Sequence, residues 1–530
     1  MHSSMTGSSH VERLLAPLAI QPERPFLLLE EGPRSRSLSF SDVDLLARRY
    51  ASRLLELGLR TGDTVALLAD SSPESIAALV AHLRLGIVTT PINTRYRAEE
   101  AGHILEDSGA KAVLFDDGEE EGRGAATLDA IPSHATPELR HRLSVSEAFA
   151  PGASPSFLSK HGSPPSAFPS GLSDSDTALL IYTSGTTGES KGVELSYRAV
   201  TENTLAVTDL WRFSHEDVLS LALPLFHVHG LCLGVLGSLL RGMAIRLHAR
   251  FDAARVVSDF ALGATVFMGV PTMYVKLLDL MTEQPEAART LARGRLFTSG
   301  SAPLPAGDFR AFREWTGQSI LERYGMTETL FTLSNPYDGE RRPGTVGQPV
   351  SGCTVRIVDE DGADVPANEP GEIVVKSNGL MTGYRGRPGE TAACFRHGWF
   401  LTGDVARREA DGYVALIGRR SVDIIKSGGF KISAREIEDC LRRHPDVKDA
   451  AVVGVPDRVF GQRIVAAVVK REGHGQTTAG SFEKEIVGFV SEHLADYKRP
   501  KRVLILPELP VNAMGKIQKH VLLRSLGETK

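Results

Sequence analysis

A segment rich in glycine and hydroxyl side chains, Tyr182-Thr-Ser-Gly-Thr-Thr-Gly-Glu-Ser-Lys-Gly192, has the composition of an anion-binding loop. Glycines let backbone N–H groups turn toward phosphate oxygens. The Ser and Thr hydroxyls add donors, and Lys191 adds a positive charge. The spacing fits neither the Walker pattern nor the dinucleotide fingerprint. An ordinary flexible loop is the alternative to a binding site for a polyphosphate.

Two further loops, Phe297-Thr-Ser-Gly-Ser-Ala-Pro303 and Leu321-Glu-Arg-Tyr-Gly-Met-Thr-Glu-Thr329, follow expected strands. Ligands of open α/β sheets bind at such strand ends. Tyr324 offers a flat face for a purine, Thr327 a hydroxyl for phosphate and Glu328 a hard oxygen ligand for Mg²⁺. The alternative for Glu328 is a carboxylate in solvent.

Two histidines occur in Leu223-Pro-Leu-Phe-His-Val-His-Gly230. On a strand, His227 and His229 would share one face, as two metal ligands do. Because no third ligand is nearby, core histidines are favoured over zinc. Farther along, Asp404 has two acceptor oxygens for the hydroxyls of a ribose, and Arg419 could support the same sugar.

Length and charge limit the possible functions. At 530 residues the chain exceeds a single core, so two or more domains are expected. A formal charge of -5 gives no field for nucleic acid or an anionic membrane. The four cysteines form no CxxC pair, which favours reduced thiols. The most apolar window, 218–245, is broken by Pro224 and Arg241, so no membrane insertion is expected. A cytoplasmic protein is predicted, with a mitochondrial one as the alternative.

The elements that must position these residues alternate between strands and helices. Helices are predicted at 43–58 and from Pro73, and strands at 63–69, 111–115 and 178–181, which indicates a parallel, helix-covered sheet. Segments 354–358 and 372–376 predict a β-rich part. After Arg419 a compact α+β unit is expected, with a capping box at Ser433-Ala-Arg-Glu436. The Pro/Gly/Ser-rich region 117–175 is predicted to be a loop insertion, with partner binding as a minor alternative.

Together these motifs resemble, nearly letter for letter, those of the adenylate-forming superfamily, which includes acyl-CoA synthetases, firefly-type luciferases and peptide-synthetase adenylation domains. The resemblance covers the chain outside 117–175. It implies an N-terminal AMP-binding domain, 1–419, of helix-covered sheets plus a β-rich part. A small mobile C-terminal α+β domain, 420–530, would follow. The implied ligands are ATP, Mg²⁺ and coenzyme A, and the protein would be a monomer or homodimer.

The resemblance also implies residue roles. Lys516, in the final Gly-Lys signature, would be the catalytic lysine, and His227 would gate the acyl pocket. Mg²⁺ would be held by Glu328 and Thr187. Coenzyme A would meet the turn Ser427, Gly428 and Gly429. ATP or AMP would be bound by Thr183, Ser184, Gly185, Thr186, Thr187, Gly188, Lys191, Gly300, Ser301, Ala302, Tyr324, Gly325, Met326, Thr327, Asp404 and Arg419.

The implied reaction has two steps. A carboxylate attacks the α-phosphorus of ATP to give acyl-AMP and pyrophosphate, and the thiol of coenzyme A then displaces AMP. Between the steps the small domain would rotate about a hinge after Arg419. The run after Arg419 is one residue longer than in many relatives, so either Ser421 or Asp423 is the predicted hinge.

The acid is predicted from Arg323, which precedes Tyr324 where many fatty-acid-activating relatives have a small residue. Its guanidinium, with His227 beside it, could hold a second carboxylate by two hydrogen bonds. The alternative is an arginine paired to Glu322 or Glu328. Arg241, Arg246 and Arg250 are weaker candidates for the same role.

The surrounding motifs look most like those of malonyl-CoA synthetases. The predicted function is therefore ATP-dependent activation of malonate, or of methylmalonate, to its CoA thioester. Activation of another short- or medium-chain acid, or transfer of the acyl group to a carrier protein, is the alternative. A nucleotide-binding protein without catalysis is disfavoured by the full set of motifs.

Overall fold

The computed structural model describes residues 9–31, 34–117, 123–150, 172–183, 190–419, 423–427, 430–457, 460–471, 479–494, 496–512 and 515–527. Several predicted site residues lie outside these ranges: Ser184, Gly185, Thr186, Thr187, Gly188, Ser421, Gly428 and Gly429. Their roles therefore stay predictions.

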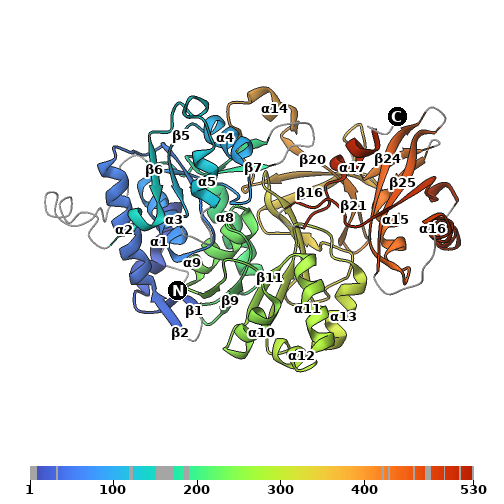
Figure 1. Cartoon of the computed structure of the whole chain (residues 1–530), viewed down its shortest axis with the longest axis horizontal. Helices are drawn as coiled ribbons and strands as arrows, with labels where there is room; N and C mark the ends of the chain where they lie inside the picture. The colour runs from blue at the N-terminus through green and yellow to red at the C-terminus, as the bar shows by residue number, and fades with distance from the viewer. Residues whose placement is uncertain are drawn as a thin grey trace.

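A seven-stranded sheet lies in the N-terminal part, with strand order β18-β8-β7-β4-β3-β5-β6 (Figure 1). Its strands are β3 (Thr64–Leu68), β4 (Val88–Pro91), β5 (Ala110–Phe115), β6 (His141–Ser144), β7 (Thr177–Thr183), β8 (Lys191–Ser196) and β18 (Gly383–Tyr384). The strands from β3 to β7 run parallel to their neighbours, and β7 and β8 are antiparallel. The predicted phosphate loop thus connects β7 to β8.

A nine-stranded sheet follows, in the order β15-β14-β13-β12-β11-β9-β10-β1-β2. Its strands are β1 (Pro25–Glu31), β2 (Arg34–Ser39), β9 (Val218–Leu221), β10 (Ala244–Leu247), β11 (Val266–Gly269), β12 (Leu296–Ser299), β13 (Leu321–Met326), β14 (Leu330–Ser334) and β15 (Gln348–Pro349). The central strands are parallel, and one continuous apolar core joins this sheet to the first.

Helices cover these sheets as the alternating pattern predicts. The helices of the N-terminal part are α1 (His10–Ile20), α2 (Phe40–Glu56), α3 (Pro73–Leu85), α4 (Ala98–Asp107), α5 (Arg123–Asp129), η1 (Ser133–Ala135), α6 (Val145–Ala148), α8 (Tyr197–Leu210), η2 (His229–Leu236), α9 (Gly237–Arg241), α10 (Ala253–Ala261), α11 (Pro271–Glu283), α12 (Glu286–Leu291), α13 (Ala306–Thr316) and α14 (Pro388–Ala393). The Ser39 side chain caps α2, and Pro73 opens α3 at a position where its missing N–H costs nothing.

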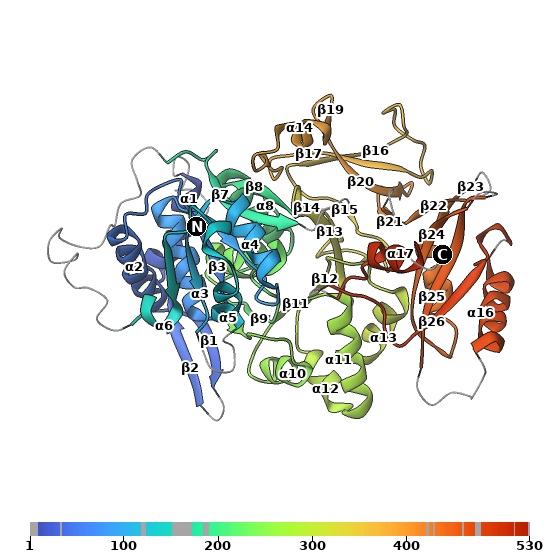
Figure 2. The same ribbon diagram turned by 45° about the horizontal axis from the view of Figure 1, so that its top comes forward.

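The β-rich part is a separate five-stranded sheet of antiparallel strands. It contains β16 (Cys353–Val358), β17 (Gly371–Ser377), β19 (Phe395–Arg396), β20 (Trp399–Arg408) and β21 (Val414–Arg419). Figure 2 shows this sheet between the N-terminal sheets and the C-terminal domain. Tyr324 of the nine-stranded sheet packs into its core, which fixes the two sheets relative to each other.

The C-terminal α+β domain has its own five-stranded sheet, with β26 paired to β25. Its elements are β22 (Ile424–Ser427), β23 (Phe430–Ser433), α15 (Ala434–Leu441), β24 (Val447–Asp457), β25 (Gly461–Lys470), α16 (Ala479–His493), η3 (Asp496–Lys498), β26 (Arg502–Leu506) and α17 (Lys519–Gly527). Two separate apolar cores pack its faces, one under α15 and α16 and the other under α17. The predicted fold class is therefore confirmed.

The prediction of a loop insertion over 117–175 is wrong for its middle. Residues 123–148 contain α5, α6 and β6, and β6 extends the seven-stranded sheet by pairing with β5. The four-residue strand His141–Ser144 is too short and too polar to show an alternation in the sequence. Within the described part of the chain, no helix is long and apolar enough to cross a membrane.

Candidate active site

Tyr324, Asp404 and Arg419 form one buried network at the junction of two sheets. The Tyr324 hydroxyl donates to Asp404 Oδ2 at 2.6 Å, and Arg419 Nε lies 2.9 Å from Asp404 Oδ1. Arg419 faces Asp404 directly across the β20–β21 ladder. Burial and the adjacent carboxylate raise the pKa of Tyr324 well above its ordinary value, so the hydroxyl stays a donor. The chain thus brings together the three residues predicted to hold the nucleoside.

Glu328 is buried at 6% exposure, and the Tyr384 hydroxyl donates to its Oε1 at 2.9 Å. The alternative of a solvated carboxylate is therefore wrong. Burial raises the pKa of Glu328. A buried carboxylate with one hydroxyl partner has lone pairs left for a hard cation, which fits Mg²⁺ completed by phosphate and water oxygens.

The backbone turns sharply between Tyr324 and Glu328. The β13–β14 ladder has an irregularity at Tyr324/Gly325, and Leu330 has a left-handed φ of 52°. A Cβ on Gly325 would lie 1.9 Å from the carbonyl oxygen of Leu330, so only glycine fits. Met326 ends β13, and Thr327 lies in the turn that follows it. This turn presents Thr327 and Glu328 beside the Tyr324 network.

Arg323 points to the other face of β13, because side chains alternate along a strand. The residue is 4% exposed, and among the described residues its Nε and Nη2 atoms have no hydrogen-bond partner. The guanidinium lies 4.8 Å from the centroid of the Phe331 ring. Burial lowers the pKa of Arg323 to about 9, which still leaves it charged at neutral pH. Within the described part of the chain, Arg323 is thus a buried cation without a paired anion.

Gly300 makes room for this cation. A Cβ on Gly300 would lie 2.5 Å from Arg323 Cζ and Nε. The next residue, Ser301, has a left-handed φ of 67°, which is strained for a non-glycine residue, and Ala302 continues the same loop after β12. The predicted nucleotide loop and the predicted acid-binding arginine are therefore in direct contact.

His229 is 1% exposed, and neither of its ring nitrogens has a hydrogen-bond partner among the described residues. Burial and then the Arg323 charge lower the pKa of His229 well below its ordinary value, so the ring is neutral. Ser299 Oγ is also buried without a partner. Several buried polar groups in one region have unused hydrogen-bonding capacity, which indicates a polar ligand.

The alternatives for the acid-binding cation do not fit. None of the described carboxylates forms an ion pair with Arg323, so pairing to Glu322 or Glu328 is wrong. Arg241 is engaged by Asp209 at 2.6 Å, Arg246 by Glu30 at 3.2 Å, and Arg250 lies 3.9 Å from Asp70. These three guanidinium groups belong to other interactions.

The prediction that His227 and His229 lie on a strand is wrong. β9 ends at Leu221, and Pro224 interrupts the ladder, after which His229 starts the π-helix η2. Burial lowers the pKa of His227 to about 4, so it is neutral near pH 7. Its ring contacts Phe226, with ring centroids 4.6 Å apart.

Lys191 begins β8, where it pairs in register with Thr183 at the end of β7. It forms an ion pair with Glu390 of α14, and its Nζ lies 5.4 Å from the centroid of the Tyr384 ring. Tyr384 thus contacts both Lys191 and Glu328. A lysine over the ring and a buried carboxylate at the hydroxyl thus contact the same tyrosine.

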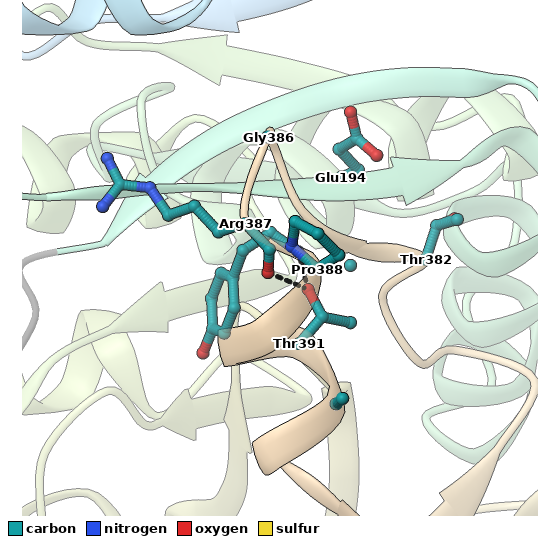
Figure 3. A pocket seen from close by; sticks show the side chains of 9 residues that line it. Glu194, Thr382, Gly386, Arg387, Pro388 and Thr391 are labelled. Atoms are coloured by element: carbon teal, nitrogen blue, oxygen red, sulfur yellow. Dashed lines mark hydrogen bonds between the residues drawn. The ribbon is translucent and has the colours of Figure 1, made fainter.

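A pocket of about 390 Å³ lies on the other side of this segment (Figure 3). Its lining includes Glu194, Tyr384, Arg387, Pro388 and Thr391. Glu194 pairs with Arg385 at 2.7 Å, and Arg387 pairs with Asp107 at 2.9 Å. Because these charged groups have partners, we assign the pocket no ligand.

Lys516 lies on the C-terminal domain, near enough to Arg419 and Asp404 for their charges to act on its amine. Although the residue is exposed, protein around its amine and the nearby Arg419 charge lower the pKa of Lys516, while Asp404 and Asp423 oppose this effect. The neighbouring Gly515 is close to Thr272 of α11, since a Cβ on this glycine would lie 2.9 Å from Thr272 Cγ2. The Lys516 loop is therefore seated on the N-terminal part.

The sequence of the chain matches two family models. A family model described as AMP-binding enzyme matches residues 17–385, and the AMP-binding enzyme C-terminal domain matches 436–516. The chain belongs to the AMP-binding enzyme family.

Three relatives of this family span most of the chain. Oxalate–CoA ligase of Arabidopsis thaliana is 35% identical, covering 92% of this chain and 93% of its own length. Malonate–CoA ligase of the same plant is 33% identical, covering 88% and 79%. Sulfoacetate–CoA ligase of Cupriavidus necator is 36% identical, covering 96% of each.

The TM-scores to solved AMP-binding enzymes differ with the ligands that those structures contain. MatB from Rhodopseudomonas palustris is 34% identical, and its ATP-bound structure gives a TM-score of 0.85, with 98% of this chain and 99% of that chain covered. Its apo structure, with 98% of each covered, gives 0.76. A malonyl-CoA ligase product complex with methylmalonyl-CoA and AMP gives 0.65, although it is 39% identical and covers 93% and 97%. Because identity does not explain this order, the domain arrangement here is closest to the ATP-bound one of the three.

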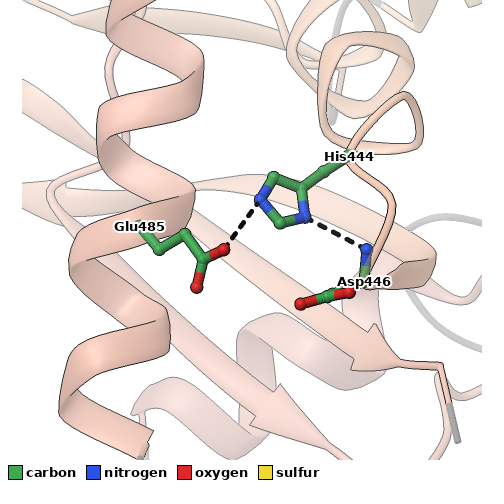
Figure 4. A group of neighbouring side chains, drawn as sticks. All are labelled: His444, Asp446 and Glu485. Carbon is green, nitrogen blue, oxygen red and sulfur yellow. Dashed lines mark hydrogen bonds and ion pairs between the residues drawn. The ribbon is translucent and has the colours of Figure 1, made fainter. Parts of the chain in front are cut away.

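Within the described residues, one set of three potential metal ligands comes together away from this site: His444, Asp446 and Glu485 (Figure 4). His444 Nδ1 accepts from the Asp446 N–H at 3.2 Å, so the ring proton is on Nε2, 3.4 Å from Glu485 Oε1. Both nitrogens are engaged, and the ring packs edge-on against two phenylalanines. The set links the end of α15 to α16, and we assign it no metal.

Sequence reasoning missed Tyr384, Glu390 and His229 as neighbours of the site. Tyr384 and Glu390 lie about two hundred residues after Lys191, and no local pattern signals their contact with it. His229 was predicted to be a core residue. Its isolation from any partner depends on the turn after Pro224, which periodicity does not describe. Ser427 was predicted at the coenzyme A turn, and it is buried at the end of β22.

Proposed function

We propose that this AMP-forming acid–CoA ligase activates malonate, with methylmalonate as a related substrate. The observation that carries the proposal is Arg323, a buried guanidinium with two unpartnered nitrogen atoms beside Gly300. A buried charge is costly unless it is paired. A second carboxylate on the substrate would supply the missing anion.

The named relatives support a doubly charged acid. Oxalate, malonate and sulfoacetate differ in length and in the second group, but each carries a second anionic group next to the carboxylate that is activated. A pocket for a long aliphatic or aromatic acid would not contain an unpaired guanidinium. Arg323 therefore accounts for the chemical feature that these acids share.

Malonate is favoured over sulfoacetate by geometry. The Nε and Nη2 atoms form one edge of the guanidinium plane, and this edge matches the two oxygens of a planar carboxylate. Relatives and solved structures that are malonate-activating ligases lend further support.

Sulfoacetate is the second candidate. Its sulfonate has three oxygens in a tetrahedral arrangement, and the neutral His229 beside Arg323 has an N–H that could reach the third. The relative that covers 96% of the chain acts on this acid.

In the first step, an oxygen of the malonate carboxylate forms a bond to the α-phosphorus of ATP, and the bond to the pyrophosphate oxygen breaks. Lys516 would stabilise the charge that develops between the carboxylate and the α-phosphate. Asp404, Arg419 and Tyr324 would hold the nucleoside, and Thr327 would donate to phosphate. The loop from Thr183 to Lys191 would hold pyrophosphate.

Bound to Glu328, Mg²⁺ would neutralise charge on the leaving phosphates. In the second step the sulfur of coenzyme A attacks the acyl carbonyl carbon and AMP leaves with its bonding electrons. We propose that the domain boundary at 419/420 is where the C-terminal domain rotates between the steps. Ser421 or Asp423 would be the hinge, and the turn that begins at Ser427 would approach the thiol.

The test is AMP release measured with ATP, coenzyme A and each of six acids: malonate, methylmalonate, oxalate, sulfoacetate, acetate and butyrate. Malonate should give the largest kcat/KM, and methylmalonate should come next. The two monocarboxylic acids should be poorest, because they leave Arg323 unpaired. A preference for butyrate would contradict the role of Arg323, and a preference for sulfoacetate would support the second candidate instead.

An assay without coenzyme A tests the remaining alternative, in which the acyl group is transferred to another acceptor such as a carrier protein. A ligase of this type should accumulate little free AMP without the thiol. Undiminished AMP release in its absence would point to another acceptor.

A further inference from the structure

Lys519 is held between two carboxylates in the interior of the C-terminal domain. It is the first residue of α17, and its side chain is 11% exposed. Its Nζ lies 2.6 Å from Glu438 Oε1 and forms a second ion pair with Asp423. Together, Lys519, Asp423 and Glu438 are called the Lys519 clasp below.

A cation is an unexpected first residue for a helix. The helix dipole places partial positive charge at its N-terminus, so an acidic residue is favoured there. Burial also disfavours the charge of Lys519, but Glu438 and Asp423 outweigh this and raise its pKa. Since buried ion pairs seldom stabilise a fold more than well-packed apolar groups do, stability does not explain this arrangement.

Both carboxylates have further backbone partners, which makes the clasp rigid. Glu438 Oε1 accepts from the N–H of Val452 at 2.7 Å. Asp423 Oδ2 accepts from the N–H of Arg419 at 2.8 Å, and the Asp423 N–H donates to the carbonyl of Arg419 at 2.7 Å. The clasp is therefore hydrogen-bonded to the end of β21, where Arg419 pairs with Asp404.

Lys519 is three residues after Lys516, and the chain between them is constrained. Val511 and Ile517 form an antiparallel bridge. The Asn512 N–H donates to the Lys516 carbonyl, and the Lys516 N–H donates to Asn512 Oδ1, each at 2.9 Å. These contacts hold the backbone of Lys516 three residues before Lys519, so we expect a shift of Lys519 to strain the Lys516 loop.

We propose that Lys519 is a positioning residue for adenylation. The clasp fixes the base of the Lys516 loop to the Arg419 strand end, so that the Lys516 amine is held beside Asp404 and Arg419. This inference rests on the proposed role of Lys516 in the first step. Because the Asp423–Arg419 contacts span the predicted boundary, the clasp acts in the domain arrangement described here.

The test compares the two half-reactions in Lys519→Met, which keeps the length of the side chain without its charge. ATP–pyrophosphate exchange with malonate reports adenylation, and thioester formation from preformed malonyl-AMP reports the second step. The kcat of exchange should fall about 10- to 100-fold, as expected when a catalytic group is misplaced by about 1 Å. The KM for ATP and the rate of thioester formation should stay within about threefold of wild type.

Two variants control for folding. Lys519→Arg keeps a cation that can reach both carboxylates, so it should recover most of the exchange activity. Lys498→Met removes an ion pair of the same domain, 2.6 Å from Glu436, without touching the Lys516 loop, and should leave exchange unchanged. A loss of both half-reactions by the same factor in Lys519→Met would overturn the proposal, because it would mean a structural role.

Lys516→Ala separates the inference from the proposed function. If Lys516→Ala loses exchange and Lys519→Met keeps it, the clasp is overturned and the role of Lys516 stands. If Lys516→Ala keeps exchange activity, the proposed role of Lys516 in adenylation is wrong, and the positioning role of Lys519 is wrong with it. Loss of exchange in both variants, with thioester formation retained, supports the inference.

Discussion

Strand β13 supplies side chains to two neighbouring regions, which differ in whether their charged groups have partners. On one face, Tyr324 joins Asp404 and Arg419, and every charged group there has a partner at 2.6 to 2.9 Å. On the other face, Arg323 and His229 are equally buried, but neither has an ionic partner among the described residues.

This difference separates a pre-formed site from an incomplete one. The hydrogen bonds of Tyr324, Asp404 and Arg419, the proposed ribose site, are made within the protein itself, so a nucleotide bound there would only replace or add to existing hydrogen bonds. The Arg323 region lacks an anion, and a ligand that supplies one would gain more from binding there. Selectivity among acids should thus depend on the unpaired face, and nucleotide affinity on the paired face.

Arg323→Met should have the largest effect. Malonate kcat/KM should fall by roughly 30-fold to several thousand-fold, because loss of one partner of a buried charge pair costs about 2–5 kcal/mol. Butyrate has no second charge and should lose little. Lysine at this position should recover only part of the activity, since it lacks the two-pronged geometry. The measurement is kcat/KM for both acids in the three proteins.

The thermal stability of Arg323→Met sharpens the comparison. Removing a buried, unpaired cation should keep or raise Tm. The matched control is Arg241→Met, which removes an arginine with 9% side-chain exposure that is paired to Asp209, and should lower Tm with little change in kcat/KM. A parallel loss of activity toward malonate and butyrate would mean that Arg323 is structural.

Glu328→Gln should have the next largest effect. Glutamine keeps the shape and the Tyr384 hydrogen bond but removes the anionic ligand, so the Mg²⁺ concentration needed for half-maximal rate should rise about 10- to 100-fold. Because burial raises the pKa of Glu328, its charge is unfavourable in the free protein, and Tm should not fall. An unchanged magnesium titration would remove Glu328 from the metal site.

Asp404→Asn tests the paired face. Asparagine can still accept from Tyr324 but loses the charge that attracts Arg419, so the KM for ATP should rise about 10-fold, the scale of one hydrogen bond to a charged group. The KM for malonate should stay nearly constant, since Asp404 lies on the other side of β13. Equal changes in both constants would mean that the two faces are not independent.

The sequence predicted strongly patterned elements well. Caps at Ser39 and Ser433 and the proline at Pro73 mark helix starts through local chemistry, and the structure has helices at all three. The sequence did not predict elements whose structure depends on tertiary pairing. His229 was predicted on a strand, but Pro224 ends the pairing. The short strand β6 exists because β5 offers a free edge, which no property of His141–Ser144 reveals.

The contacts in the candidate site divide in the same way, into those that motifs predict and those that depend on tertiary structure. Motifs predicted that Tyr324, Asp404 and Arg419 serve one ligand, and these three residues do meet. Pairings such as Lys191 with Glu390, or Lys519 with Asp423, join segments far apart in the chain. A charge pattern in the sequence cannot identify such partners, because most charged residues are simply solvated.

The smallest effect on activity is expected for the other charged residue of β13, Glu322. It is 2% exposed, its Oε1 accepts from the Leu304 N–H at 3.2 Å, and its Oε2 has no partner. Burial raises the pKa of Glu322 to about 7, a shift that Arg435 of the C-terminal domain opposes and Asp439 increases. Because side chains alternate along a strand, Glu322 points away from Arg323. Among the described residues it makes no hydrogen bond or ion pair with Asp404 or Arg419.

The sign of the pH effect follows from this raised pKa. The folded protein binds a proton at Glu322 up to about pH 7, whereas the unfolded chain releases it near its ordinary pKa of 4.5. Wild type should therefore lose stability as the pH rises from about 4.5 to 7, by at most about 3 kcal/mol at 1.36 kcal/mol per pKa unit. Glu322→Gln cannot ionise, so its Tm should exceed that of wild type by a few degrees at pH 8, and by less at pH 5.

Thermal scans of wild type and Glu322→Gln between pH 5 and 8 measure this difference. The exposed Glu369→Gln is the control and should show no such trend. Malonate kcat/KM should change by less than about threefold at pH 8, because Glu322 points away from Arg323 and has no hydrogen bond to Asp404 or Arg419 among the described residues. A Tm difference that does not vary with pH would mean that Glu322 is not the titrating group, and a large loss of malonate activity would make it part of the acid site.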